Sequence, residues 1–146
     1  MRILFIDPGD TTGWCYLEAP DTILGYGNLP YASLIEFIGD WDYAKKPIDV
    51  FLVGDFIMFD RRRQRFGDRQ KTTRALGAIE VAARMSRTRL VKQDSSVIPT
   101  AIKRTGIDPT KGSHKKTHWA YAYLHAAYYL TLLGLRKSAL QLAREK

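Results

Sequence analysis

The stretch MRILFIDPGDTTGW, residues 1–14, determines how the rest of the chain is interpreted. Residues 3–6 form a short apolar run that ends abruptly at Asp7, and Pro8 and Gly9 follow directly. An apolar run bounded by Pro and Gly is typical of a buried strand, and Pro-Gly favours a tight turn. Asp7 therefore stands at the end of a strand, where a carboxylate can leave the core and face a ligand. A turn-initiating Asp is the plainer interpretation of the same residue.

Length and composition indicate a single globular domain over residues 1–146, large enough to bury a core. Apolar residues make up 45% of the chain and charged residues 26%, which fits a soluble protein. No apolar run reaches the ~18 residues of a membrane span and no signal peptide is apparent, so we expect no membrane partner. The single cysteine, Cys15, allows no intrachain disulfide and suits a reducing, cytoplasmic location.

Hydrophobic patterning predicts a chain that mixes strands and helices. Strands are expected as a hairpin over residues 1–16 and singly over residues 24–29, 49–59 and 90–92. Helices are expected over residues 32–41, 72–85, 97–104, 117–133 and 138–146. We expect Ser95 or Ser96 to cap the third of these helices and Thr117 to cap the fourth.

The charge of the chain indicates a polyanionic partner. The formal net charge is +8, from 23 Lys and Arg against 15 Asp and Glu. The segment RRRQRFGDRQKTTR, residues 61–74, is the most basic stretch, and we expect a mobile loop that leads into a helix there. Its cations would contact phosphates and its phenylalanine would stack on bases, although a merely solvated basic loop is the alternative. The candidate DNA-binding residues are Arg61, Arg62, Arg63, Arg65, Phe66, Arg69, Lys71, Arg74, Lys115 and Lys116.

The first hairpin resembles the opening of the RuvC-type Holliday junction resolvases, especially compact phage-encoded ones. The matching features are the hydrophobic run, Asp7-Pro8-Gly9, the two hydroxyl residues and Gly13-Trp14. The resemblance implies a ribonuclease H-like α/β fold, in which a mixed sheet is flanked by helices. It also implies a homodimer that cleaves branched DNA, such as a four-way junction, in the host cytoplasm. A metal-binding catalytic Asp would stand at Asp7, with Mg²⁺ as cofactor and Mn²⁺ as the alternative ion.

The resemblance also implies acids on the central strand and on the last long helix, and there the chain departs from the family. Gly54 falls at the position of a Glu, and Asp55 follows one place later. A one-residue offset in a flat strand turns a side chain to the opposite face, so only a bulge or twist at Gly54 would return Asp55 to the site. His118 matches the start of the helix, but Tyr121 stands where an acid is expected. A phenol, with a pKa of about 10, is a poor Mg²⁺ ligand.

The candidate catalytic and metal-binding residues are therefore Asp7, Asp55 and His118. Asp10 and Asp60 are further carboxylates, although their spacing does not place them in the site. Cleavage of a phosphodiester by two metal ions needs several converging carboxylates, because the ions must activate water and stabilise the leaving oxygen. The leading hypothesis is a Mg²⁺-dependent junction endonuclease. The alternatives are a catalytically silenced protein that still binds DNA, and an RNA-directed nuclease of the same fold.

Overall fold

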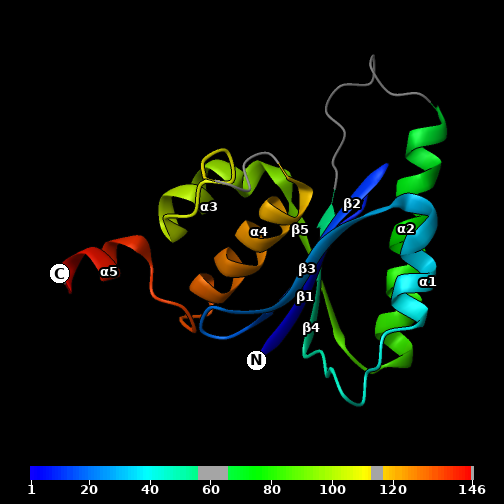
Figure 1. The fold of residues 1–146 in the computed structure, drawn as a ribbon, viewed down its shortest axis with the longest axis horizontal. Coiled ribbons are helices and arrows are strands. Elements are labelled where there is room, and N and C mark those ends of the chain that lie inside the picture. The colour runs from blue at the N-terminus through cyan, green and yellow to red at the C-terminus, as the bar shows by residue number, and fades with distance from the viewer. Residues whose placement is uncertain (56–65, 113–116, 146) are drawn as a thin grey trace.

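The computed structural model describes residues 1–55, 66–112 and 117–145, with side chains for all of these except 55 and 66–72. Within this part, five strands form one sheet in the order β3-β2-β1-β4-β5 (Figure 1). The strands are β1 (Arg2–Asp7), β2 (Thr11–Glu18), β3 (Thr22–Pro30), β4 (Val50–Asp55) and β5 (Arg89–Asp94). Because β1 pairs antiparallel with β2 but parallel with β4, the predicted mixed sheet is confirmed.

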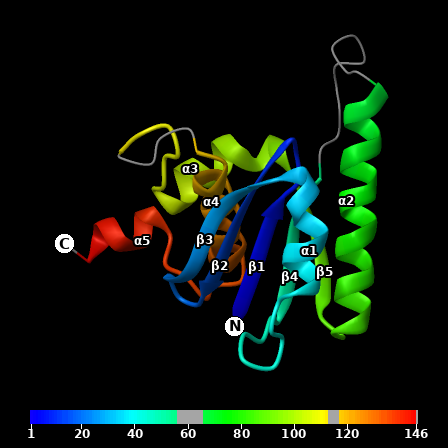
Figure 2. The same ribbon diagram turned by 45° about the vertical axis from the view of Figure 1, so that its right-hand side comes forward.

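Helices cover both faces of this sheet, as Figures 1 and 2 show. One face carries α1 (Leu34–Gly39) and α2 (Phe66–Met85). The other carries α4 (His118–Leu132), against which α3 (Ile98–Thr105) packs, while α5 (Ala139–Arg144) contacts α3. Short 3₁₀ turns, η1 (Tyr31–Ser33) and η2 (Ser95–Val97), precede α1 and α3. The predicted ribonuclease H-like layering is confirmed.

The side chains of β1 divide between two hydrophobic cores. Leu4 and Ile6 belong to the cluster under α1 and α2, whereas Ile3 and Phe5 belong to the cluster under α4. All four are fully buried. Because successive side chains of a strand point to opposite faces, Asp7 continues the series that faces α4. The strand therefore delivers its terminal carboxylate to the α4 face.

Two details of the prediction were wrong. The second long helix begins at Phe66 rather than at residue 72, so the second half of the basic segment is helical instead of a loop. Arg, Gln and Lys are good helix formers, and a run of positive charge does not end a helix. Neither Ser95 nor Ser96 caps the following turn with its side chain, because the Asp94 carboxylate accepts a hydrogen bond from the Ser96 N–H at 2.6 Å. Residues 56–59 of the predicted central strand lie outside the described residues.

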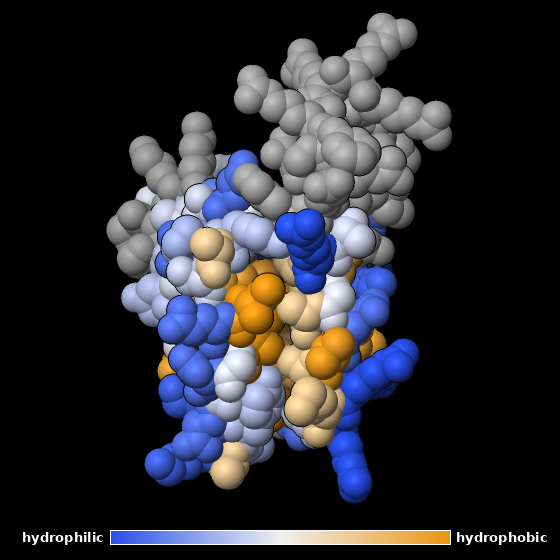
Figure 3. Space-filling view, turned by 90° about the vertical axis from the view of Figure 1, so that its right-hand side faces the viewer, coloured by the Kyte–Doolittle hydropathy of each residue, from blue (hydrophilic) through white to orange (hydrophobic). Residues whose placement is uncertain are grey.

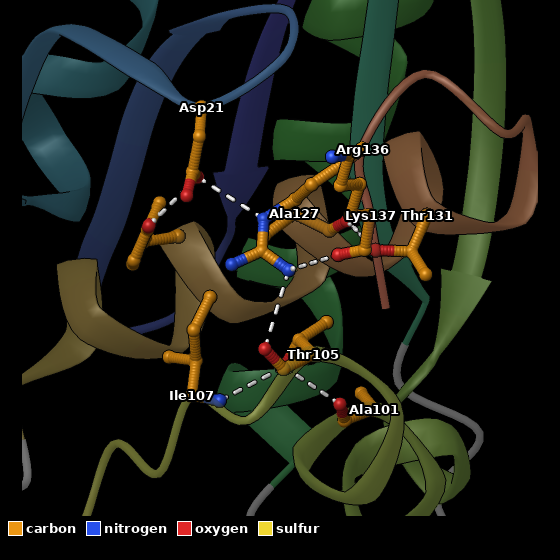
Figure 4. Close-up of polar contacts among 9 residues, drawn as sticks. Asp21, Ala101, Thr105, Ile107, Ala127, Thr131, Arg136 and Lys137 are labelled. Carbon is orange, nitrogen blue, oxygen red and sulfur yellow. Dashed lines mark hydrogen bonds and ion pairs between the residues drawn. The ribbon is translucent and has the colours of Figure 1, made fainter. Parts of the chain in front are cut away.

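The C-terminal segment is fastened to the sheet and to α3 through Arg136, which is buried (Figure 4). Its Nε lies 3.2 Å from Asp21 Oδ1, an ion pair without hydrogen-bond alignment, and its Nη1 donates to the Thr105 carbonyl at 3.2 Å. The Tyr123 hydroxyl of α4 donates to the same Asp21 oxygen at 2.8 Å. These contacts fix α4 at the end of the sheet opposite Asp7. None of the described helices is long and apolar enough to cross a membrane.

Candidate active site at the end of the first strand

The Asp7 carboxylate is the centre of the candidate site. Its side chain is partly buried, and burial raises the pKa of the carboxyl from 3.8 to about 6. No hydrogen-bond donor or cation among the described residues contacts it. A carboxylate that has lost part of its hydration without gaining a partner is unfavourable, and a bound cation would offset that cost.

The start of α4 lies directly on β2 beside Asp7. Asp7 is paired with Gly13 across the β1–β2 ladder. A Cβ at Gly13 would lie 2.3 Å from the carbonyl carbon of His118 and 2.4 Å from its carbonyl oxygen. Only a glycine permits so close an approach of the two backbones. Gly13 therefore brings the exposed His118 to the same end of the sheet as Asp7.

A side chain from β3 holds the helix start in this position. Thr117 occupies the N-cap position as predicted, but it makes no side-chain cap hydrogen bond. Instead Asn28 Oδ1 accepts from the Trp119 N–H at 2.9 Å, and the Tyr26 ring packs on the Trp119 ring at 4.1 Å between centroids. Asn28 is itself paired with Gly13. The cap of α4 thus comes from a residue 91 positions away in the chain, which no local pattern could reveal.

Gly54 occupies the position beside Asp7 on β4. The ladders that join β4 to β1 and β5 run without a register shift, and they pair Gly54 with Gln93 and Asp55 with Asp94. A Cβ at Gly54 would lie 2.8 Å from Asp7 Oδ1 and 3.6 Å from Phe5 Cζ. The Asp7 carboxylate therefore leans over Gly54, in the space that a side chain there would occupy. Asp55 would reach the site only through a bulge or twist at Gly54, and the described ladders show no register shift there. The side chain of Asp55 lies outside the described residues, so its part in the site stays a prediction.

Beyond Gly54 the same face carries a buried polar pair. Gln93 Oε1 lies 2.7 Å from His125 Nδ1, and both residues are almost fully buried. The His125 ring stacks on Phe5 with 4.8 Å between centroids and 7° between planes. Burial lowers the pKa of His125 to about 4, so the imidazole is neutral at physiological pH. His125 is therefore a buried hydrogen-bonding residue rather than a charged one.

Asp7 fits a divalent cation as a single ligand. Among the described residues, no group of three or more His, Cys, Asp or Glu is placed to hold a metal. Mg²⁺ needs few protein ligands, because it keeps several waters and is commonly bound by one or two carboxylates together with substrate phosphates. The Asp7 carboxylate, which contacts no cation in the part of the chain that the structure describes, meets that requirement, with His118 at the same end of the sheet. Asp10 is exposed in the turn after β1, and Asp60 lies outside the described residues.

Most of the predicted DNA-binding residues lie beyond the described side chains. Arg74 is exposed on α2, and the backbones of Phe66, Arg69 and Lys71 belong to the same helix. The remaining members, Arg61, Arg62, Arg63, Arg65, Lys115 and Lys116, lie outside the described residues. The basic segment, residues 61–74, nevertheless begins six residues after β4 ends, on the side of the sheet where β1 ends at Asp7, and its second half belongs to α2.

The fold is closely similar to solved structures. Thermus thermophilus RuvC in complex with a Holliday junction substrate superposes with a TM-score of 0.68 at 18% identity, over 94% of this chain and 99% of that chain. A further Thermus thermophilus RuvC structure gives a TM-score of 0.65 at 16% identity, with the same coverage. The chain has the RuvC fold.

A third RuvC-like neighbour is the yeast mitochondrial Holliday junction resolvase Ydc2. Its TM-score is 0.58 at 12% identity, over 92% of this chain and 81% of that chain. No protein-family model and no curated protein matches the sequence. The RuvC fold is therefore preserved at an identity where sequence comparison alone finds nothing.

Two residues that build this candidate site were missed by sequence reasoning. Gly13 interrupts an apolar strand, and an isolated glycine in a strand indicates a bulge or a close backbone approach, so that signal was available. Asn28 gave no comparable signal, because the amide it caps lies in a distant part of the chain.

Proposed function

We propose that this chain is a metal-dependent, structure-selective endonuclease that cleaves branched DNA, and four-way junctions in particular. The observation that carries the proposal is the Asp7 carboxylate, which has no partner among the described residues and is held beside the start of α4 in a RuvC fold. Its structural neighbours support the substrate class, since one was solved with a Holliday junction and another is a Holliday junction resolvase. We expect it to act in the cytoplasm, of a host cell if the chain is phage-encoded.

The cofactor that fits this site is Mg²⁺, which Mn²⁺ could replace. Asp7, Asp55 and His118 would hold it, and the bound ion would neutralise negative charge on the phosphodiester. Asp7 must be ionised to bind the ion, so the pKa of about 6 of its free carboxyl predicts that Mg²⁺ affinity, and with it activity at limiting Mg²⁺, falls as the pH drops below 6. If the exposed His118 imidazole does not bind the ion, it would instead position the attacking water and accept its proton.

DNA would be held by the basic segment that follows β4. A net charge of +8 gives a salt-dependent attraction to phosphates, and seven cations of residues 61–74 would supply much of it. Replacing Arg61, Arg62 and Arg63 together by Ala should weaken junction binding and lower the slope of log affinity against log salt by up to about 3. Fluorescence anisotropy at several salt concentrations measures both. An unchanged slope would remove these arginines from the interface.

The exposed face formed by α1 and α2 is the surface that we assign to a homodimer (Figure 3). Ile35, Val81 and Met85 are 60%, 57% and 83% exposed, around a groove of about 650 Å³ that Gly77 and Ala78 help to line. In a two-fold contact the protruding side chains of one subunit would enter the small-residue floor of the other. Sedimentation of the protein and of its Val81→Asp variant tests this assignment, because the variant should be monomeric.

A silenced, DNA-binding protein is the alternative. It rests on Gly54 and Tyr121, which stand where the resemblance implies acids. The position of the Asp55 side chain distinguishes the two hypotheses, since a second carboxylate at the metal would support phosphodiester cleavage.

The decisive experiment is cleavage of a labelled four-way DNA junction beside the matching linear duplex, with Mg²⁺, with Mn²⁺ and with EDTA. We expect metal-dependent cutting of the junction, and none by Asp7→Asn. An RNA junction in the same assay tests the RNA-directed alternative. Tight junction binding without cutting under either metal would establish the silenced alternative, and no binding at all would refute both.

A further inference from the structure

Gln93 is a buried glutamine, and only the oxygen of its side-chain amide has a hydrogen-bond partner among the described residues. Its side chain is 8% exposed, and Oε1 lies 2.7 Å from Nδ1 of His125, which is 4% exposed. A carbonyl oxygen only accepts hydrogen bonds, so Nδ1 must carry the ring proton and donate it. Stacking on Phe5 holds the imidazole in turn. The Gln93 amide is therefore locked with its oxygen toward α4.

This orientation leaves the amide nitrogen of Gln93 without a partner in the described part of the chain. Neither of its two N–H donors has a hydrogen-bond acceptor among the described residues, yet the atom is not sealed from solvent as Arg136 Nε is. Buried polar groups normally find partners, and leaving one unsatisfied is costly. A donor pair that is rigidly held, unpaired and still accessible is what a ligand-binding group requires.

The register of the sheet places this donor in the candidate site. Gln93 is paired with Gly54, over which the Asp7 carboxylate leans. Neighbouring strands lie about 4.8 Å apart, so Asp7 and Gln93 flank Gly54 from the two adjacent strands and on the same face. Phe5 touches both parts of this arrangement, because it approaches the Gly54 position and stacks on His125.

We propose that the Gln93 side-chain amide is a substrate-binding donor of this site, which hydrogen-bonds a non-bridging oxygen of the phosphodiester that lies beside Asp7. His125 is the positioning residue that aims it. A carboxylate repels a phosphate, whereas an amide N–H₂ offers two neutral donors to it. The assignment rests on the proposed function, in that the ligand is the phosphate backbone of the junction.

The test replaces Gln93 by Met, which keeps the length of the side chain and removes the donors. Junction affinity, measured by anisotropy in EDTA, should fall about tenfold to a hundredfold, as expected when a hydrogen bond to a charged group is lost. Gln93→Glu should bind still more weakly because it places a second acid there. Thermal unfolding of each variant separates a loss of binding from a loss of fold. Wild-type affinity in folded Gln93→Met would overturn the proposal.

A second measurement needs no variant to fold. In ¹H–¹⁵N spectra of the wild-type protein, the Gln93 amide pair, assigned by its proximity to the His125 ring, should shift when the four-way junction is added. The Gln141 amide on α5 is an internal control that should not move. If backbone amides next to Asp7 shift while the Gln93 pair does not, the proposal is refuted.

These readouts also separate the proposal from the nuclease assignment. A shifted Gln93 amide in a protein that cuts no junction would keep the donor and reject the nuclease. Junction cleavage by Gln93→Met at the wild-type rate and affinity would keep the nuclease and reject the donor. A wild-type protein that binds no junction would reject both.

Discussion

The two glycines that flank Asp7 across the sheet are crowded in different ways. At Gly13 the nearest atoms are the backbone of His118, at 2.3 and 2.4 Å from an added Cβ, whereas at Gly54 the nearest atom is the Asp7 carboxylate oxygen, at 2.8 Å. Backbone at a helix start cannot retreat without moving the helix, but a carboxylate can rotate. Gly13 therefore allows α4 to dock on the sheet, and Gly54 leaves the space in which the Asp7 carboxylate lies.

Gly13→Ala should cause the largest loss of stability in this comparison. The new Cβ would force α4 off the sheet, and overpacking of this kind costs roughly 3 kcal/mol of unfolding free energy. Urea denaturation measures the loss. Gly39→Ala is the matched control, because no atom lies within 4 Å of its added Cβ, and its stability should stay within about 1 kcal/mol of wild type. Equal stability of the two variants would contradict the close contact between β2 and α4.

Asp7→Asn should stabilise the protein at neutral pH. Burial raises the pKa of Asp7 from 3.8 to about 6, so the folded state favours the protonated form and the carboxylate opposes folding once it ionises. This cost is absent below the unfolded pKa, grows between the two values and is complete above about pH 6. The shift corresponds to up to about 3 kcal/mol, which partial access to solvent reduces.

Melting curves at about pH 4 and pH 7.5 test the expected stability difference between Asp7→Asn and wild type. The melting temperature of the variant should equal that of wild type at the lower pH and exceed it at the higher one. Mg²⁺ should raise the melting temperature of wild type at the higher pH and leave Asp7→Asn unchanged, because a ligand stabilises only the state that binds it. A variant that is less stable than wild type at neutral pH would show that Asp7 is a structural residue.

Asn28→Ala should cause an intermediate loss of stability, because Asn28 holds the start of α4 near Gly13. It removes the oxygen that accepts from the Trp119 N–H, and loss of an N-terminal cap costs about 1 kcal/mol. Asn28→Asp keeps an acceptor and adds a negative charge at the positive end of the helix, so it should retain wild-type stability. Equal losses for Ala and Asp in chemical denaturation would mean that the cap contributes nothing.

Gly54→Ala should change stability least, by less than about 1 kcal/mol, since the crowded atom is the free end of a side chain. The Asp7 carboxylate would nevertheless be displaced, and a misplaced catalytic group lowers the rate by about a hundredfold. Junction cleavage under single-turnover conditions, beside urea denaturation, measures both quantities. If Gly54→Ala lost stability but kept full activity, Gly54 would serve the packing of the sheet and not the position of the Asp7 carboxylate.

Much of the fold could be predicted because its signals are local. The apolar run before Asp7 predicts a buried strand, and the apolar stretch that ends at Asp55 predicts the central strand of the sheet. The start of α2 was placed six residues too late, because a basic run was taken to indicate a loop although its residues favour helix. The cap of the helix predicted over residues 97–104 was assigned to Ser95 or Ser96, whereas the helical segment begins earlier, at η2, and Asp94 caps it.

The sequence by itself determined that Asp7 ends a buried strand, that His118 begins a long helix and that the chain carries a net charge of +8. Only the tertiary structure decided which residues surround that carboxylate. Gly13, Gly54 and Gln93 reach it through strand registers, and His125 meets Gln93 from a helix 32 residues away. Strand registers and helix docking are set by packing across the whole sheet, so no local pattern in the chain encodes them.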